Sequence, residues 1–299
     1  MNELNEKAQK WLDMIGRPRN YHYERHLRLI RKIETDEFDG ELYEQANGPG
    51  TVQKTLLMLP KTVDTKRPAV VVPFYYPDRV AGYHLDTLEP TNEPVIAFGL
   101  HLVRRGYIVV TAEAYHLTYC KMDHDRQDFS RWKRSAEALL QDHPEWTGIG
   151  KLVADTQLLV DLLCSDPRVD SNRIGIAGHS LGGKMALYTG CLDARIKAIL
   201  GSDFGIEWDR TNWSDLWYWG DKVDELKAAG MDHAELLRIG GLKPFILIAG
   251  QYDNEDALDV IKRAGYSDPS QYLFINHATG HRPPMEVLER CYDFFATCF

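Results

Sequence analysis

Cysteine is scarce in this chain, and its cysteines form no recognisable pairs. The 299 residues include five cysteines, and no two of them have the CxxC spacing that zinc and redox sites use. The histidines likewise show no metal-ligand spacing. The sequence therefore predicts free thiols and no metal site.

Positive charge is also in the minority. Lysine and arginine number 35 against 44 aspartate and glutamate residues, which gives a net charge of -9 and a pI near 5.7. Nucleic-acid binding gains most of its affinity from clustered lysine and arginine on phosphate. The composition thus argues against a nucleic-acid partner.

Long apolar runs are missing as well. Residues 1–11 are mostly polar, with two glutamates and two lysines, where an export signal needs a basic start and an apolar run. No window approaches the roughly 18 uninterrupted apolar residues of a membrane span. We expect a soluble, cytoplasmic protein without a membrane partner.

The chain does contain enough apolar residues, 44% of the total, for a large core. Its length exceeds that of a typical domain, but α/β sheets carry such lengths as one domain with insertions. We expect a helical extension over residues 1–40 and a catalytic domain over residues 41–299. Apolar residues at helical spacing predict two accessory helices between residues 2 and 33.

Short apolar runs alternate with helical patterns through the catalytic domain. Such alternation implies right-handed βαβ crossovers and an α/β fold, with a mostly parallel central sheet and helices on both faces. In such sheets the chemistry lies at the carboxyl ends of the strands. We expect strands at residues 51–59, 69–72, 107–112, 173–177, 196–200, 244–249 and 271–275, and helices at residues 94–105, 149–164, 181–189, 256–264 and 284–296.

Two segments interrupt this alternation, residues 115–148 and residues 202–242. Both are long enough to form lids or pocket walls, and the second is expected to be a lid-like insertion. Its tryptophans would suit stacking on a sugar or an aromatic ester, or else would form a small core of the insertion itself. The candidate pocket residues are Trp208, Trp213, Trp217 and Trp219.

A GxSxG motif, from Gly178 to Gly182, lies directly between a short apolar strand and a helix. This context is typical of the nucleophile elbow of the α/β-hydrolase fold. The serine of such an elbow adopts strained backbone angles, and the flanking glycines have no Cβ to collide with the turning chain. The motif therefore predicts that Ser180 is a nucleophile.

A serine nucleophile needs a base to accept its proton, and in this fold the chain order is serine, acid, histidine. Asp253 follows the strand at residues 244–249, and His281 lies in the loop before the last helix. We expect Asp253 to orient His281 and His281 to act as general base. Asp256 is the alternative acid, and His277 is the alternative histidine.

An oxyanion hole requires two N–H donors near the nucleophile. The Leu181 N–H at the start of the helix after Ser180 is the first candidate, since the positive end of the helix dipole also points there. The second donor is expected just after the strand at residues 69–72, from the backbone of Tyr75 or Tyr76. Pro73 cannot donate because it has no N–H.

Three segments together resemble the dienelactone hydrolase-like and acetyl xylan esterase-like branches of the α/β-hydrolase superfamily: residues 101–113, residues 169–186 and residues 249–254. The resemblance spans residues 68–299. It implies removal of acyl groups from sugars or opening of small esters, and some relatives are peptidases of the prolyl oligopeptidase type. Dienelactone hydrolase uses cysteine as nucleophile, so Ser180 favours the esterase side.

The sequence predicts a serine hydrolase that cleaves a carboxylic ester, such as an acylated sugar or a small aromatic ester, through an acyl-enzyme and without a cofactor. An amidase or peptidase would use the same three side chains, and a thioesterase or lactonase is chemically close. A non-catalytic binding protein on the same fold is disfavoured because the three side chains are all present. A homo-oligomer is left open by the sequence.

Overall fold

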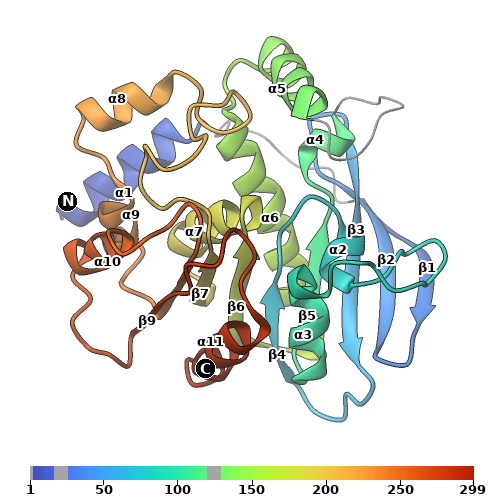
Figure 1. Cartoon of the computed structure of the whole chain (residues 1–299). Coiled ribbons are helices and arrows are strands. Elements are labelled where there is room, and N and C mark those ends of the chain that lie inside the picture. The colour runs from blue at the N-terminus through green and yellow to red at the C-terminus, as the bar shows by residue number, and fades with distance from the viewer. Residues whose placement is uncertain (1–2, 17–25, 120–128) are drawn as a thin grey trace.

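The centre of the molecule is a nine-stranded sheet in the order β1-β2-β3-β5-β4-β6-β7-β8-β9 (Figure 1). The computed structural model describes residues 3–16, 26–119 and 129–299. The pairs β1–β2, β2–β3 and β3–β5 are antiparallel. The remaining pairs, β5–β4, β4–β6, β6–β7, β7–β8 and β8–β9, are parallel. The strands are β1 (Leu27–Glu34), β2 (Phe38–Ala46), β3 (Val52–Pro60), β4 (Arg67–Val71), β5 (Ile108–Ala112), β6 (Val169–His179), β7 (Ile196–Ser202), β8 (Phe245–Ala249) and β9 (Tyr272–Asn276).

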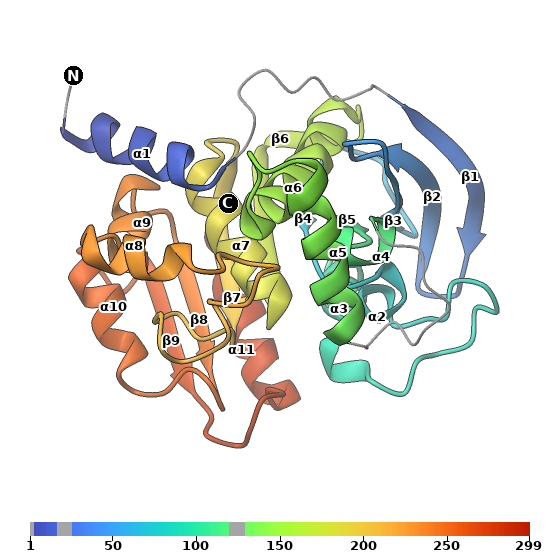
Figure 2. The same cartoon turned by 90° about the horizontal axis from the view of Figure 1, so that it is seen from above.

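Helices surround this sheet, as the view from above shows (Figure 2). Those over the described residues are α1 (Glu3–Met14), α2 (Pro77–Ala81), α3 (Phe98–Arg104), α4 (Tyr115–Thr118), α5 (Phe129–Asp142), α6 (Gly148–Ser165), α7 (Leu181–Leu192), α8 (Lys222–Ala228), α9 (His233–Ile239), α10 (Ala257–Ala264) and α11 (Met285–Ala296), with a 3₁₀ turn at Pro94–Ile96. No helix of these segments is both long and apolar enough to cross a membrane.

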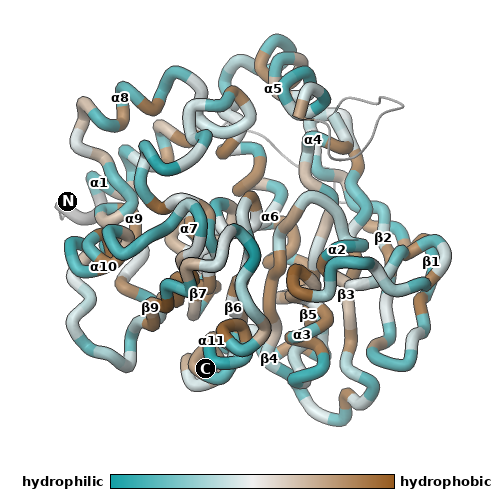
Figure 3. Tube along the Cα trace, viewed as in Figure 1, coloured by the Kyte–Doolittle hydropathy of each residue, from teal (hydrophilic) through white to brown (hydrophobic). Residues whose placement is uncertain are grey.

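The two faces of the sheet carry separate apolar cores, because successive strand residues point to opposite faces. Val71 of β4 belongs to the core that includes residues of α6 and α7, whereas Val70 belongs to the core that includes residues of α3 and α11. β8 is buried at all five positions, as a parallel strand covered on both faces should be. Figure 3 shows the apolar residues gathered along central strands such as β4.

The predicted α/β-hydrolase architecture is confirmed. Every strand and helix expected between residues 51 and 296 is present within a few residues of its expected bounds. The expected helix at residues 94–105 is divided into the 3₁₀ turn at Pro94–Ile96 and α3.

The prediction of two N-terminal helices is only half right. The first is α1, but Leu27–Glu34 forms strand β1, which pairs with β2; residues 17–25 lie outside the described residues. The apolar side chains Leu27, Leu29 and Ile30 are exposed on this strand, so they do not form the buried stripe that helical spacing suggested. Pairing with β2 supplies the backbone hydrogen bonds instead.

The two insertions lie near the carboxyl ends of the central strands (Figure 1). Residues 202–242 include α8 and α9, and residues 115–148 include α4 and α5; residues 120–128 lie outside the described residues. α1 contacts α9, so the N-terminal helix packs against the insertion rather than standing apart from the catalytic domain.

Candidate active site

Four consecutive parallel strands each deliver one candidate residue at their carboxyl ends. Ser180 follows β6, Asp203 follows β7, Asp253 follows β8 and His281 follows β9. These strands are neighbours in the sheet, so the loops that carry the four side chains meet at one edge. This is where an α/β sheet is expected to place its chemistry.

Ser180 has the backbone conformation of a nucleophile elbow. Its φ of 55° and ψ of -117° lie outside the regions that L-residues prefer. A Cβ at Gly178 would lie 2.2 Å from the carbonyl oxygen of Gly182, and one at Gly182 would lie 2.1 Å from that of Pro73. Both glycines are therefore required by close backbone approach, and the turn holds Ser180 at the wall of a cavity.

Two donor groups lie beside Ser180. Leu181 is the first residue of α7, so its N–H has no acceptor within the helix. Tyr75 lines the same cavity as Ser180, and burial raises the pKa of Tyr75 to about 12, so the phenol stays protonated. The sequence predicts a backbone donor from Tyr75 or Tyr76, and both residues line the cavity; the protonated hydroxyl of Tyr75 is a further donor group there.

His281 is held by a carboxylate, and that carboxylate is Asp203. The Nδ1 atom of His281 lies 2.7 Å from Oδ2 of Asp203. Burial alone would raise the pKa of Asp203, but its hydrogen bonds with His281 and with backbone amides hold that pKa below its usual range. Asp203 is thus ionised at neutral pH, and it can orient His281 and stabilise the imidazolium.

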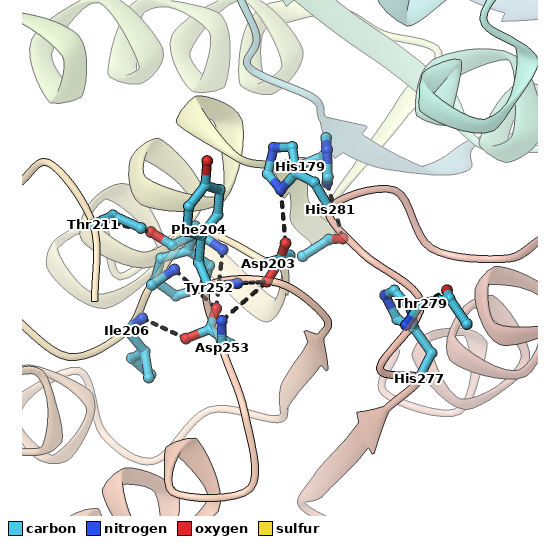
Figure 4. A network of polar contacts seen from close by, with 12 residues as sticks. His179, Asp203, Phe204, Ile206, Thr211, Tyr252, Asp253, His277, Thr279 and His281 are labelled. Atoms are coloured by element: carbon cyan, nitrogen blue, oxygen red, sulfur yellow. Dashed lines mark hydrogen bonds and ion pairs between the residues drawn. The ribbon is translucent and has the colours of Figure 1, made fainter.

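The prediction that Asp253 orients His281 is contradicted by these contacts. The carboxylate of Asp253 instead accepts three backbone N–H groups of the loop after β7, from Phe204 and Gly205 at 2.9 Å each and from Ile206 at 2.6 Å (Figure 4). These bonds direct it away from His281. Burial raises the pKa of Asp253 to about 6.

The two aspartates connect their loops reciprocally. Oδ1 of Asp203 accepts the N–H groups of Tyr252 at 2.8 Å and Asp253 at 3.0 Å, in the loop after β8. Asp253 in turn accepts amides of the loop after β7. Because each loop is fixed by the carboxylate of the other, the position of Asp203 depends on Asp253.

Asp203 was missed because it is the second residue of the segment assigned to the lid-like insertion. The available signal was a carboxylate directly after β7, the strand adjacent to the one that ends at the elbow. Its φ of 42° is unusual for a residue other than glycine. That angle is a property of the folded loop and cannot be predicted from the sequence.

His179 supports His281 from the side. The two imidazole rings lie 4.4 Å apart between centroids, and Nδ1 of His179 lies 3.0 Å from Oγ of Ser202. Burial lowers the pKa of His179 to about 3, so its ring is neutral beside His281. The described contacts include no direct hydrogen bond between Ser180 and His281, although both line the same cavity; such bonds often form only when substrate is bound.

The alternative residues take other roles. Nδ1 of His277 lies 2.7 Å from Oγ1 of Thr279, outside the group formed by the four strand ends. Asp256 forms an ion pair with Arg210. Across the described residues, no group of three or more histidine, cysteine, aspartate or glutamate side chains is arranged to hold a metal ion.

The cavity beside Ser180 has a volume of about 450 Å³. Its aromatic lining includes Tyr75, Phe129, Trp132 and Tyr218. Tyr75 and Trp132 are stacked, with ring centroids 4.5 Å apart. The insertion at residues 115–148 therefore contributes to the pocket wall through α5.

The four tryptophans predicted to line the pocket do not line this cavity. Trp213, Trp217 and Trp219 are buried, and Trp208 packs against them as part of the same core. Three of their indole N–H groups donate within the fold: Trp208 to the carbonyl of Met231, Trp213 to the carbonyl of Gly205, and Trp219 to the Tyr188 hydroxyl. They belong to the large core that also contains residues of α1, α6, α7 and the sheet, so the structure shows neither a pocket wall nor a separate small core of the insertion.

Comparisons with known proteins agree with this architecture. The model of the Abhydrolase family matches residues 5–211, and among curated proteins no sequence matches the chain. A glucuronoyl esterase from Solibacter usitatus is similar in structure with a TM-score of 0.72 and 13% identity, covering 100% of this chain and 92% of that one.

Two further solved structures have the same fold. A CE15 glucuronoyl esterase from Teredinibacter turnerae T7901 gives a TM-score of 0.66 at 16% identity, covering 98% of this chain and 84% of that one. An acetyl xylan esterase from Paenibacillus sp. R4 gives 0.61 at 14% identity, covering 100% and 95%. At such identities the similarity establishes the fold alone.

Proposed function

Since the chain belongs to the Abhydrolase family, we propose that it is a serine esterase that cleaves a carboxylic ester through an acyl-enzyme. The observation that carries the proposal is the hydrogen bond between His281 and Asp203 beside an elbow serine on the same cavity. Nothing in this chemistry requires a cofactor.

In the proposed first step, Ser180 Oγ attacks the ester carbonyl and His281 accepts its proton. Asp203 keeps the Nδ1 proton of His281 in place, so that Nε2 is free to act as base. The Leu181 N–H and a donor from Tyr75 stabilise the oxyanion. The protonated His281 then gives its proton to the leaving alcohol.

In the second step a water molecule attacks the acyl-enzyme, with His281 again taking the proton. Collapse of the second tetrahedral intermediate releases the carboxylic acid and restores Ser180. The aromatic side chains of Trp132 and Tyr218 provide flat surfaces in the cavity, and flat faces suit either a sugar ring or an aromatic group. The names of the structural relatives favour an acylated sugar.

Turnover of p-nitrophenyl acetate and longer p-nitrophenyl esters tests the proposal, with p-nitroanilides of the same acyl groups as matched amides. We expect ester turnover by the wild-type protein and a loss of about 10⁵-fold or more in kcat for Ser180→Ala. Faster cleavage of the anilides would point to an amidase. Equal ester turnover by the variant would refute the role of Ser180.

A further inference from the structure

A lysine with no carboxylate partner lies in the wall of the proposed active site. Lys184 is on α7, one helical turn after Ser180, and both line the cavity. Lys184 is 3% exposed, so its ammonium has lost nearly all of its bulk hydration. Burying an ammonium is costly unless it is paired and hydrogen-bonded.

The described surroundings compensate this cost only in part. The Nζ of Lys184 donates to Oδ1 of Asn212 at 2.9 Å, and it lies 4.0 Å from the ring centroid of Tyr218 and 4.2 Å from that of Trp213. An ammonium has three donors, and one amide oxygen accepts only one of them here. Among the described residues, no carboxylate lies within ion-pair distance of the Lys184 ammonium.

The nearest described carboxylate contact of this ammonium runs through a second side chain, Asn212. Asp215 reaches it only indirectly, because Asp215 bonds the Nδ2 of Asn212 and Asn212 bonds Lys184. Burial lowers the pKa of Lys184 to about 7. An anion bound in the cavity would favour the charged form and would raise this pKa.

Two arginines add positive charge to the same cavity. Arg79 and Arg282 both line it, and both pair with one carboxylate, Glu93. Two guanidinium groups therefore share a single negative charge. Among the described residues, the carboxylate that lines the cavity itself is that of Asp203, and it is already engaged by His281 and two amides.

This local excess of positive charge opposes the net charge of -9 of the whole chain. Lys184, Arg79 and Arg282 around one cavity suit an anionic ligand better than a neutral one. A cavity of this kind concentrates field lines and favours ligands of the opposite sign.

We propose that the cavity binds esters that carry an anionic group, such as a carboxylate, with Lys184 as the buried donor to that group and Arg79 and Arg282 as its electrostatic support. This inference rests on the proposed esterase function and narrows its substrate class. The anion belongs to a part of the substrate other than the ester itself, in either the acyl or the alcohol portion.

Two matched pairs of substrates test the proposal, and in each pair the members differ by one charge. On the acyl side, mono-4-nitrophenyl adipate carries a free carboxylate, and methyl 4-nitrophenyl adipate has the same carboxylate capped as a methyl ester. 4-Acetoxybenzoate and its methyl ester differ in the same way on the alcohol side. We expect kcat/KM to be about tenfold or more higher for the anionic member of at least one pair, as a charge-assisted hydrogen bond would provide.

The variant that assigns this preference is Lys184→Met, which removes the charge and keeps a long side chain. We expect the ratio of anionic to capped kcat/KM to fall at least fivefold in this variant. Lys197→Met is the matched control, because Lys197 is exposed on β7 and does not line the cavity; its ratio should equal that of the wild type. Competitive inhibition by free adipate should weaken in Lys184→Met alone.

The outcomes separate this inference from the proposed function. If neither member of either pair is hydrolysed, the esterase function itself fails. If both members are hydrolysed with equal kcat/KM, the esterase function stands and the anionic substrate class is overturned. A preference for the anion that survives unchanged in Lys184→Met would overturn the role of Lys184.

Discussion

At the scale of single residues, the structure distinguishes two aspartates that look alike in the sequence. Both follow strands, and both lie near the end of the sheet that carries Ser180. Only Asp203 contacts His281, and Asp253 accepts amides of the loop that carries Asp203. Asp203 is therefore the proposed orienting acid, and Asp253 is a positioning residue that acts through it.

Substitution separates these two roles. Asp203→Asn should lower kcat by about 10³-fold to 10⁴-fold, because His281 would lose its orienting carboxylate. Asp253→Asn should lower kcat less, and should lower the free energy of unfolding by about 1–3 kcal/mol, because an amide cannot accept the three N–H groups equally well. Steady-state kinetics and urea unfolding of both variants measure the difference. An Asp203→Asn variant with nearly wild-type kcat would contradict the assignment.

The lowered pKa of Lys184 should make the stability of the protein depend on pH. This pKa is about 7 in the folded protein, below the ordinary lysine value of 10.5, so the unfolded chain binds more protons than the folded one between those values. Stability therefore rises with pH across this window. The free energy of unfolding of the wild type, relative to Lys184→Met, should increase by about 2 kcal/mol from pH 7 to pH 9. Urea unfolding at both pH values measures it; a constant difference would show that Lys184 titrates normally.

At the scale of elements, helix α1 is an integral part of the fold. Trp11 is fully buried, and its ring lies 5.9 Å from that of Tyr188 and 6.2 Å from that of Trp219 between centroids. Its Nε1 donates to Glu235 at 3.2 Å. Helix α1 thereby joins the aromatic core of the insertion to α7.

Truncation of Trp11 should consequently destabilise the whole domain. Trp11→Ala should lower the free energy of unfolding by about 3–5 kcal/mol, as expected for a large side chain removed from a core. Leu12→Ala is the matched control, since Leu12 is 46% exposed, and it should change stability by less than about 1 kcal/mol. Thermal or urea unfolding measures both. Equal effects of the two substitutions would mean that α1 is not docked as described.

At the scale of the whole molecule, most of the fold could be predicted from the sequence. Buried parallel strands such as β8 are continuous apolar runs, and the elbow at Ser180 carries a motif whose glycines are needed locally. These signals are short-range. The sequence predicts a helix at β1 because its apolar residues have helical spacing. Its strand conformation depends on pairing with β2, which local spacing does not show.

The parts that could not be predicted depend on contacts distant in sequence. Which aspartate meets His281 is decided by the reciprocal bonds between the loops after β7 and β8. Whether tryptophans face a cavity or a core is decided by α1 and α7, which cover them. Residue type and spacing identify such groups as candidates, and packing assigns their roles.

The central claim is that Ser180 is an activated nucleophile, and intact-mass analysis after reaction with a fluorophosphonate tests it most directly. We predict a single adduct on the wild-type protein, no adduct on Ser180→Ala, and slow labelling of Asp203→Asn. Absence of labelling of the folded wild-type protein, or an undiminished adduct on Ser180→Ala, would contradict the account.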